Sequence, residues 1–180
     1  MPISSGDLLF KLSIKTGTAG NQNAQGDVNE SLGKYISTTE IVNATLNNLF
    51  DNVSGDENAA LDEEYRCIFI HNAHSGLTLQ NTKLWIDSQV ANGADCEIGL
   101  DPSGASPIGY ADIQAAEIAD EDTAPGGVTF SAPTTKAAGL NIGNLSAGYC
   151  HGIWIKRTAT NSVAIDADGI TIKIEGESSA

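Results

Sequence analysis

Short apolar segments, separated by breaks rich in Gly, Pro, Asn and Asp, are the feature that most constrains this chain of 180 residues. The breaks recur at intervals of roughly 8–15 residues, which is typical of the short strands of a sandwich or barrel. No βαβ rhythm is present, which disfavours a parallel sheet covered by helices. We therefore predict an all-β fold, mainly an antiparallel β-sandwich of jelly-roll or immunoglobulin-like type, with a barrel as the alternative.

The expected strands are runs of β-branched, aromatic and aliphatic residues. In 8–15, Phe10, Leu12 and Ile14 alternate with polar residues, as in a half-buried strand. Asn-Gly at 92–93 and Asp-Gly at 168–169 are hairpin signals. The other strands are expected at 65–71, 77–79, 82–87, 96–100, 128–130, 140–142, 149–158 and 170–174, with 113–118 a strand or a helical turn, and the core is expected to hold Phe69, Trp85, Ile98, Trp154 and Ile172.

The first third of the chain differs in character from the rest. Residues 16–33 carry too little apolar surface to offset the entropy of ordering, so we expect a flexible arm. A Ser-Thr-Thr-Glu sequence then has the form of a capping box, and the apolar residues of 39–51 recur at helical spacing, which predicts one short helix. The chain is expected to comprise a strand, arm and helix over 1–60 and a sandwich core over 61–180.

The chain carries 9 Lys and Arg against 23 Asp and Glu, a net charge of −14. Affinity for nucleic acid depends on Lys and Arg neutralising phosphates, so the composition excludes a nucleic-acid interface, and anionic lipid would also repel the protein. The N-terminus lacks the basic and apolar regions of a secretory signal, and no stretch reads as a transmembrane helix. We expect neither nucleic acid nor membrane as a partner.

The three cysteines lie inside apolar or alternating runs, as buried structural thiols do. Their odd number implies no disulfide framework and favours a reducing compartment. Zinc sites need four ligands, usually with short paired spacings, and no Cys-x-x-Cys occurs here. The residues weighed as zinc ligands, and set aside, are Cys67, His71, His74, Cys96, Cys150 and His151.

Other catalytic and metal motifs are also incomplete. Asp166-Ala-Asp168-Gly169 begins like a calcium loop, but its glycine comes too early, so a hairpin turn explains it better. There is no Gly-x-Ser-x-Gly elbow and no glycine-rich phosphate loop, and Asp95 and Glu97 fall on the solvent side of a strand. We expect no cofactor and no enzymatic activity, while the acidic residues 120–122 leave open a cation held between subunits.

A sugar-binding β-sandwich is an alternative, because such modules present exposed aromatic rings. Trp85 and Trp154 lie mid-strand among aliphatic residues and are expected in the core. Tyr35, Tyr110 and Tyr149 lie near loops and are the candidates for stacking on a sugar.

Five ordered blocks stand out in the sequence: Glu64-Tyr-Arg-Cys-Ile-Phe-Ile-His-Asn72, Lys83-Leu-Trp-Ile86, Glu97-Ile-Gly-Leu-Asp-Pro102, Thr123-Ala-Pro-Gly-Gly-Val-Thr-Phe130 and Gly152-Ile-Trp-Ile-Lys-Arg-Thr158. Together they resemble small virion structural proteins of tailed bacteriophages. Within that class, an acidic single domain with a polar arm is most similar to capsid decoration (cement) proteins, which bind the lattice of the major capsid protein. The resemblance contributes no catalytic or metal-binding residues.

The resemblance implies a structural protein made in the cytoplasm of the bacterial host and placed on the outer surface of the capsid. Its expected partners are the major capsid protein and further copies of itself, for instance as a trimer. Polar segments of this kind order on a partner, so the arm is expected to make the contacts. A tail, baseplate or fibre component and the sugar-binding module remain alternatives. The candidate contact residues are Thr16, Asn21, Asn23, Gln25, Asp27 and Asn29.

Overall fold

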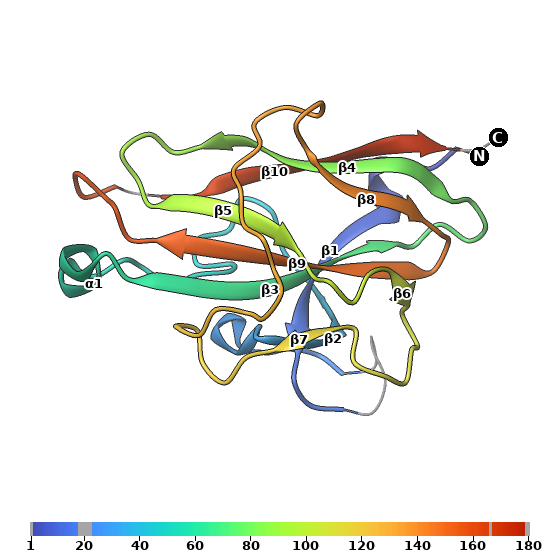
Figure 1. Ribbon diagram of the computed structural model, residues 1–180, viewed down its shortest axis with the longest axis horizontal. Helices are drawn as coiled ribbons and strands as arrows, with labels where there is room; N and C mark the ends of the chain where they lie inside the picture. Colours follow the sequence, from blue (N-terminus) through green and yellow to red (C-terminus); the bar gives the residue numbers. More distant parts are fainter. Residues whose placement is uncertain (1, 18–22, 166, 179–180) are drawn as a thin grey trace.

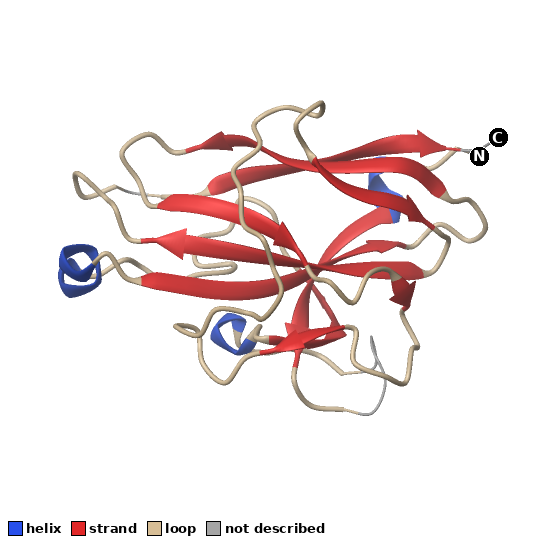
Figure 2. Cartoon of the chain, in the orientation of Figure 1, coloured by secondary structure: helices blue, strands red, loops and turns tan. Residues whose placement is uncertain are grey.

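The computed structural model describes residues 2–17, 23–165 and 167–178. These residues form two antiparallel sheets with very little helix (Figure 1, Figure 2), which confirms the prediction of an all-β, sandwich-like fold. Within these ranges, no helix is long and apolar enough to cross a membrane.

The larger sheet has seven strands in the order β5-β9-β3-β1-β2-β7, with β6 also paired to β9, and the smaller sheet has the order β10-β4-β8. The helical elements are short: η1 (Ser5–Asp7), η2 (Val28–Glu30) and α1 (Gly55–Ala60). The strands are β1 (Leu8–Ile14), β2 (Gly33–Glu40), β3 (Glu63–Asn72), β4 (Leu79–Gln89), β5 (Asp95–Leu100), β6 (Ser106–Pro107), β7 (Ala115–Glu117), β8 (Leu140–Leu145), β9 (Tyr149–Thr158) and β10 (Ile170–Ser178).

The central strands β3 and β9 are buried on both faces, which explains their nearly unbroken apolar sequences. On one face, Ile68 and Ile70 pack in the core that the smaller sheet completes. On the other, Phe69 and Trp154 belong to a second cluster that includes residues of β7 and the loops beside it. The core prediction is confirmed for Phe69, Trp85, Ile98 and Trp154, which are buried, whereas Ile172 is half-buried.

A buried carboxylate ties the second cluster together. The Trp154 indole Nε1 donates a hydrogen bond to Asp101 Oδ2 at 2.9 Å, and the backbone N–H of Ala116 donates to the same oxygen at 2.8 Å. Asp101 thereby joins β9 to β7 across the outer face of the larger sheet. Two donors therefore satisfy this buried carboxylate oxygen within the fold, as is usual for buried polar atoms.

The larger sheet curls at β1. In Figure 1, β2 and β7 lie below β3, whereas β4 and β10 lie above it. The register of β1 with β2 shifts between Lys11 and Ser13, and such irregularities bend a strand. The smaller sheet therefore covers β3, β9 and β5 but leaves an opening beside β1. Since β1 lies between β2 and β3, residues of 1–60 and of 61–180 share one sheet.

The helix predicted over 39–51 is wrong. Strand β2 continues to Glu40, and an irregular loop follows it as far as Ser54. Ala44 and Asn47 have positive φ values of 57° and 54°, a left-handed backbone that a helix cannot contain. The capping box of the only α-helix in the described residues lies at Ser54 and Glu57 instead, at the start of α1.

The two hairpin predictions are also wrong: 92–93 is a turn and 168–169 directly follows the turn residue Ala167, but neither connects two strands that pair with each other. The turn at 92–93 leads from β4 in the smaller sheet to β5 in the larger, and the segment with 168–169 leads from β9 back to β10, so each crosses between sheets. The two connections bind each other: Ala94 N donates to Asp168 Oδ2 at 2.7 Å, and Val90 N donates to the Gly169 carbonyl at 3.0 Å. Together they close one end of the sandwich.

The strand predicted at 128–130 is absent from the described fold, and its neighbour Ser131 forms an isolated bridge with Ile98. The carbonyl of Pro133 accepts a hydrogen bond from Ile86 N at 2.8 Å, so this segment joins β5 to β4. The ambiguous segment 113–118 contains the short strand β7.

Candidate binding groove

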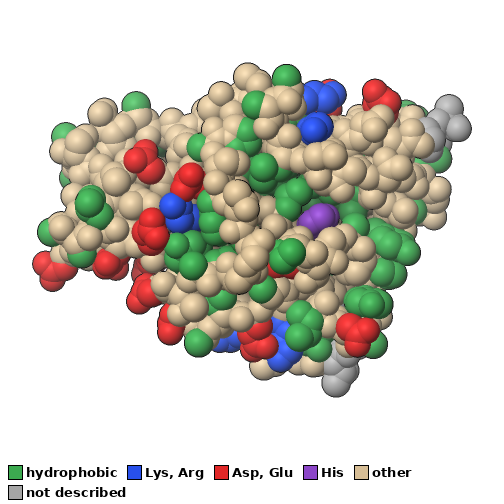
Figure 3. Space-filling view, viewed as in Figure 1, with side chains coloured by type: hydrophobic (Ala, Val, Ile, Leu, Met, Phe, Trp, Pro, Cys, Tyr) green, Lys and Arg blue, Asp and Glu red, His purple; other side chains and the backbone are tan. Residues whose placement is uncertain are grey.

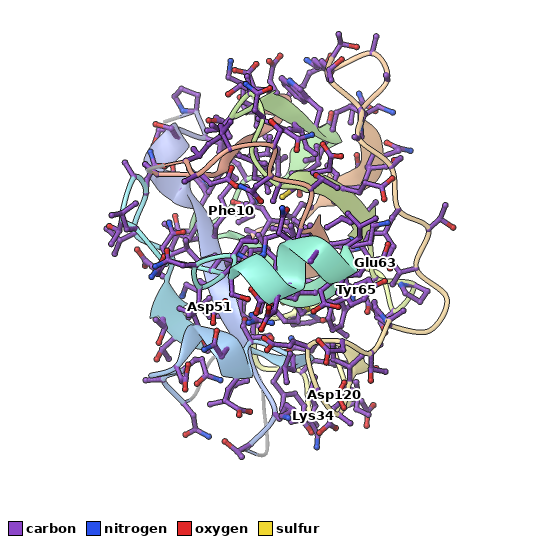
Figure 4. The ribbon with its side chains drawn as sticks, turned by 90° about the vertical axis from the view of Figure 1, so that its left-hand side faces the viewer. Phe10, Lys34, Asp51, Glu63, Tyr65 and Asp120 are labelled. Atoms are coloured by element: carbon purple, nitrogen blue, oxygen red, sulfur yellow. The ribbon has the colours of Figure 1, made fainter. Side chains whose placement is uncertain are left out.

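A groove of about 1470 Å³ occupies the opening between the two sheets. Its floor consists of Phe10 of β1, Ile68 of β3, Ile155 of β9 and Ile172 of β10. Three segments far apart in sequence form the walls: the loop after β2, the β4–β5 turn and the β9–β10 turn. Figure 4 views the molecule from the α1 side and labels Phe10 of β1 and Asp51 of the loop after β2, which both line the groove.

The loop 41–54 is held at its C-terminal half by one aromatic ring. The Phe50 ring centroid lies 5.2 Å from the guanidinium of Arg66 and 4.7 Å from that of Arg157, both within cation–π range. Arg157 Nη2 also donates to Asp51 Oδ1 at 3.2 Å. The loop is thereby fixed against the larger sheet, and its tip projects beside the groove.

Buried charges support this arrangement from below. Arg157 Nε donates to Glu64 Oε2 at 2.6 Å, and both side chains are buried. Burial raises the pKa of the Glu64 carboxyl, and the charge of Arg157 opposes that shift. Arg66, fully buried, forms an ion pair with Glu121 and donates to Asn29 Oδ1 at 2.9 Å. Arg157 itself lines the groove, whereas Glu64, Arg66 and Glu121 lie outside its lining.

Exposed apolar side chains gather at the mouth of the groove. Leu46, Val90 and Val163 line it and are 67%, 38% and 58% exposed, and Val42, on the same loop as Leu46, is 65% exposed. Side-chain amides line the groove between them. Exposed apolar groups beside amides suit an extended peptide, whose side chains fill apolar sites while its backbone bonds to the amides. The amides are Asn43, Asn47, Asn48, Asn52, Asn58 and Asn161. Of these, Asn48, Asn58 and Asn161 already donate hydrogen bonds within the chain.

The arm prediction is wrong for residues 23–33, and 18–22, with Asn21, lie outside the described residues. The Gln25 side chain donates to the carbonyls of Ser13 and Glu30, at 3.2 and 3.1 Å. Asp27 accepts from Asn29 N at 3.0 Å, which caps η2, and Asn29 accepts from Arg66. These polar side chains serve the fold because their partners are close along β1 and β3. Thr16, Asn23, Asp27 and Asn29 are exposed, and Gln25 is half-buried.

The three cysteines are buried and unbridged, as predicted. Burial raises the pKa of the Cys96 and Cys150 thiols to about 12 and that of Cys67 well above its usual value. Within the described ranges, no three His, Cys, Asp or Glu side chains are placed to hold a metal ion. Buried thiols held neutral are poor nucleophiles and poor ligands.

The histidines are also occupied or buried. His71 is buried, and burial together with the charge of Lys11 lowers its pKa to about 4. Burial lowers the pKa of His151, whose Nε2 lies 3.2 Å from the Asp101 carbonyl oxygen. His74 Nδ1 accepts from Leu77 N at 2.9 Å within its turn.

Three of the carboxylates weighed as cation ligands, Asp120, Glu121 and Asp168, are bonded within the chain. Asp168 Oδ2 accepts from Asn161 Nδ2 at 2.9 Å as well as from Ala94, and Asp166 lies outside the described residues. Asp120 accepts from the Thr123 hydroxyl, and Glu121 pairs with Arg66. These carboxylates therefore have structural roles, in turns and in a buried ion pair.

For a sugar site, the aromatic residues are mostly unsuited. Both tryptophans are buried, as is Tyr35, and Tyr149 is half-buried. Tyr110, 42% exposed, is the remaining ring of the three candidate tyrosines.

Sequence reasoning missed the groove because its walls come from three separated segments. One signal was present in the sequence: the apolar residues Val42 and Leu46 lie among asparagines. The predicted helix would have buried these two side chains on its apolar face, whereas an exposed loop leaves them in solvent. In an irregular loop, exposed apolar residues of this kind point to a binding surface.

Comparison with known proteins identifies no relative of this chain. No family model matches the sequence, and neither a curated protein nor a solved structure matches it.

Proposed function

We propose that this chain is a non-enzymatic structural protein of a tailed-phage particle, which decorates the capsid by binding the major capsid protein through the groove. The observation that carries the proposal is the set of exposed apolar side chains, Leu46, Val90 and Val163, which line a groove together with side-chain amides. The block resemblance to virion proteins supplies the partner class. The buried, neutral thiols and histidines support a binding role over a catalytic one.

The charge and the lining of the groove indicate the kind of capsid segment that would bind in it. The net charge of −14 favours a basic partner, and Figure 3 shows acidic side chains gathered around α1, whose residues Gly55 and Asn58 line the groove. An extended capsid segment with apolar anchors and flanking Lys or Arg fits both features. Exposed Thr16 and Asn23 provide a second contact on the same lattice in this proposal.

Attachment at many identical sites stabilises a shell through multivalency. Each copy that contacts two capsid subunits makes its second contact effectively intramolecular, so modest affinity per contact suffices. An acidic surface suits the outside of the shell, because packaged DNA would repel it inside.

The test is co-sedimentation of purified protein with phage heads that lack it. Leu46→Asp places a charge at the mouth of the groove and is expected to weaken binding at least about tenfold. Ile113→Asp is the matched control, because Ile113 is 52% exposed and does not line the groove; it should bind like the wild type.

Equal binding of the two variants and the wild type would refute the groove as the contact. Binding of the wild-type protein to purified tails, and not to heads, would favour the tail, baseplate or fibre alternative. Binding to immobilised glycans that is lost in Tyr110→Ala would favour the sugar-binding alternative.

A further inference from the structure

Strand β10 presents an open edge. In the part of the chain that the structure describes, β10 pairs with β4 on one side and ends the smaller sheet on the other. Half of the backbone N–H and C=O groups of such an edge strand point outward, and they form a template for another strand. At nine residues, β10 is long for an unprotected edge.

The side chains of β10 alternate regularly from Ile170 to Glu177. Ile170, Ile172, Ile174 and Gly176 are half-buried and face the sandwich, while the residues between them are exposed. A trough of about 410 Å³ runs beside 172–176, with Ile3, Leu8 and Phe10 on its other side. The inner face next to the open edge is therefore apolar and incompletely filled.

We propose that β10 pairs with β10 of a second copy, antiparallel about a twofold axis at Ile174. Ile174 is the middle residue of the strand, so this register alone pairs all nine residues. It places Lys173 opposite Glu175 of the second copy, and Glu175 opposite the Lys173 of that copy. Opposite charges facing each other across an antiparallel pair stabilise it, so the outer face of the strand is complementary to itself.

Neighbouring registers are less favourable. An axis at Lys173 brings two lysines together, and an axis at Glu175 brings two glutamates together, which is destabilising. A shift by one residue in one strand would set inner residues opposite outer ones, which the pleat forbids. The sequence of β10 thus selects the register centred on Ile174.

The pairing joins two three-stranded sheets into one of six strands and extends existing charge pairs. Lys173 Nζ lies 2.9 Å from Asp87 Oδ1, and Glu175 pairs with Lys136. Across the axis these become alternating chains of Asp87, Lys173, Glu175 and Lys136. On the inner face, Ile174 meets its own copy, and the isoleucines of the second strand face the trough.

Sedimentation velocity on the pure protein, over concentrations from micromolar to millimolar, tests the proposal. The expected species are a monomer of 18.7 kDa and a dimer of twice that mass. Lys173→Glu creates two Glu–Glu contacts per dimer and should raise the dissociation constant at least about tenfold. Lys173→Glu combined with Glu175→Lys restores opposite charges and should recover dimerisation. Lys34→Glu, which breaks the exposed pair with Glu117, is the control and should dimerise normally.

Hydrogen exchange provides a second measurement that needs no variant. Alternate amides within 170–178 should gain protection as the wild-type protein becomes dimeric. A monomer at every concentration, a trimer, a dimer indifferent to Lys173→Glu, or unchanged exchange in 170–178 would overturn the pairing. These experiments contain no capsid. They can therefore refute the β10 pairing without refuting the groove proposal, and the co-sedimentation test can refute the groove proposal without refuting the pairing.

Discussion

The guanidinium of Arg157 lies 4.7 Å from the centroid of the Phe50 ring, while its Nε donates to the buried carboxylate of Glu64 at 2.6 Å. One side chain thus neutralises a buried acid and anchors the loop that forms a wall of the groove. This couples the stability of the sandwich to the shape of the candidate binding site.

Arg157→Met should therefore be strongly destabilising. It leaves Glu64 buried without its partner, which costs on the order of 3–5 kcal/mol of unfolding free energy. Combining Arg157→Met with Glu64→Leu should recover a large part of that loss, because no charge then stays buried. Urea unfolding of the wild type and the variants measures this. Equal stability of Arg157→Met and the wild type would show that the pair is exposed to solvent.

Truncation of Trp154 should damage the second core cluster. Trp154→Ala removes the largest fully buried side chain and leaves the Asp101 carboxylate without one of its donors, so we expect a loss of about 3–5 kcal/mol. Trp154→Phe keeps most of the packing and should lose less. Thermal unfolding followed by circular dichroism distinguishes the two, and an unchanged midpoint for Trp154→Ala would contradict its placement in the core.

The stability should fall on acidification, in part through His71. Its pKa is lowered to about 4 in the folded protein from an ordinary value of 6.5, so the unfolded chain binds the proton first. The contribution of neutral His71 is fully present above pH 6.5 and is lost as the pH falls from 6.5 to 4. It amounts to about 3 kcal/mol at most.

Urea unfolding between pH 4 and 8 tests this, with His71→Gln as the variant and His74→Gln as the control. The pH dependence should flatten in His71→Gln alone. A curve for His71→Gln parallel to that of the wild type would exclude His71 as the titrating group.

The thiols should be unreactive in the native protein. All three are buried, and burial raises their pKa values, so the thiolate that attacks disulfide reagents is rare at neutral pH. We expect no labelling by an aromatic disulfide in buffer and labelling of all three cysteines in denaturant. Rapid labelling of Cys96, which lines the groove, would mean that the groove opens more deeply than its walls allow.

The sequence predicted the elements whose structure is decided locally. The run 65–71 predicted a strand, and the structure confirms it within β3, which is buried on both faces. The turn at 92–93 was predicted correctly, whereas 168–169 lies just after the turn residue Ala167. Their assignment as hairpins failed because a dipeptide determines the local bend and not the sheet that the next strand joins.

The remaining wrong predictions concern segments whose structure is determined by tertiary contacts. Val42 and Leu46 have helical spacing, but pairing of β2 with β1 extends the preceding strand to Glu40, and the left-handed residues in the loop prevent a helix. The arm was predicted from its polar composition, yet Gln25 and Asn29 find partners on β1 and β3 that no local rule reveals. The groove depends on the curl of β1, so it could not be predicted before the sheets were known.

A cryo-electron microscopy map of the phage particle tests the central claim most directly. The account predicts this chain on the outer surface of the head, in many copies, with the groove and Leu46 against the major capsid protein. Density for the chain confined to the tail or baseplate, at a few copies per particle, or a copy on the head whose groove faces solvent, would contradict it.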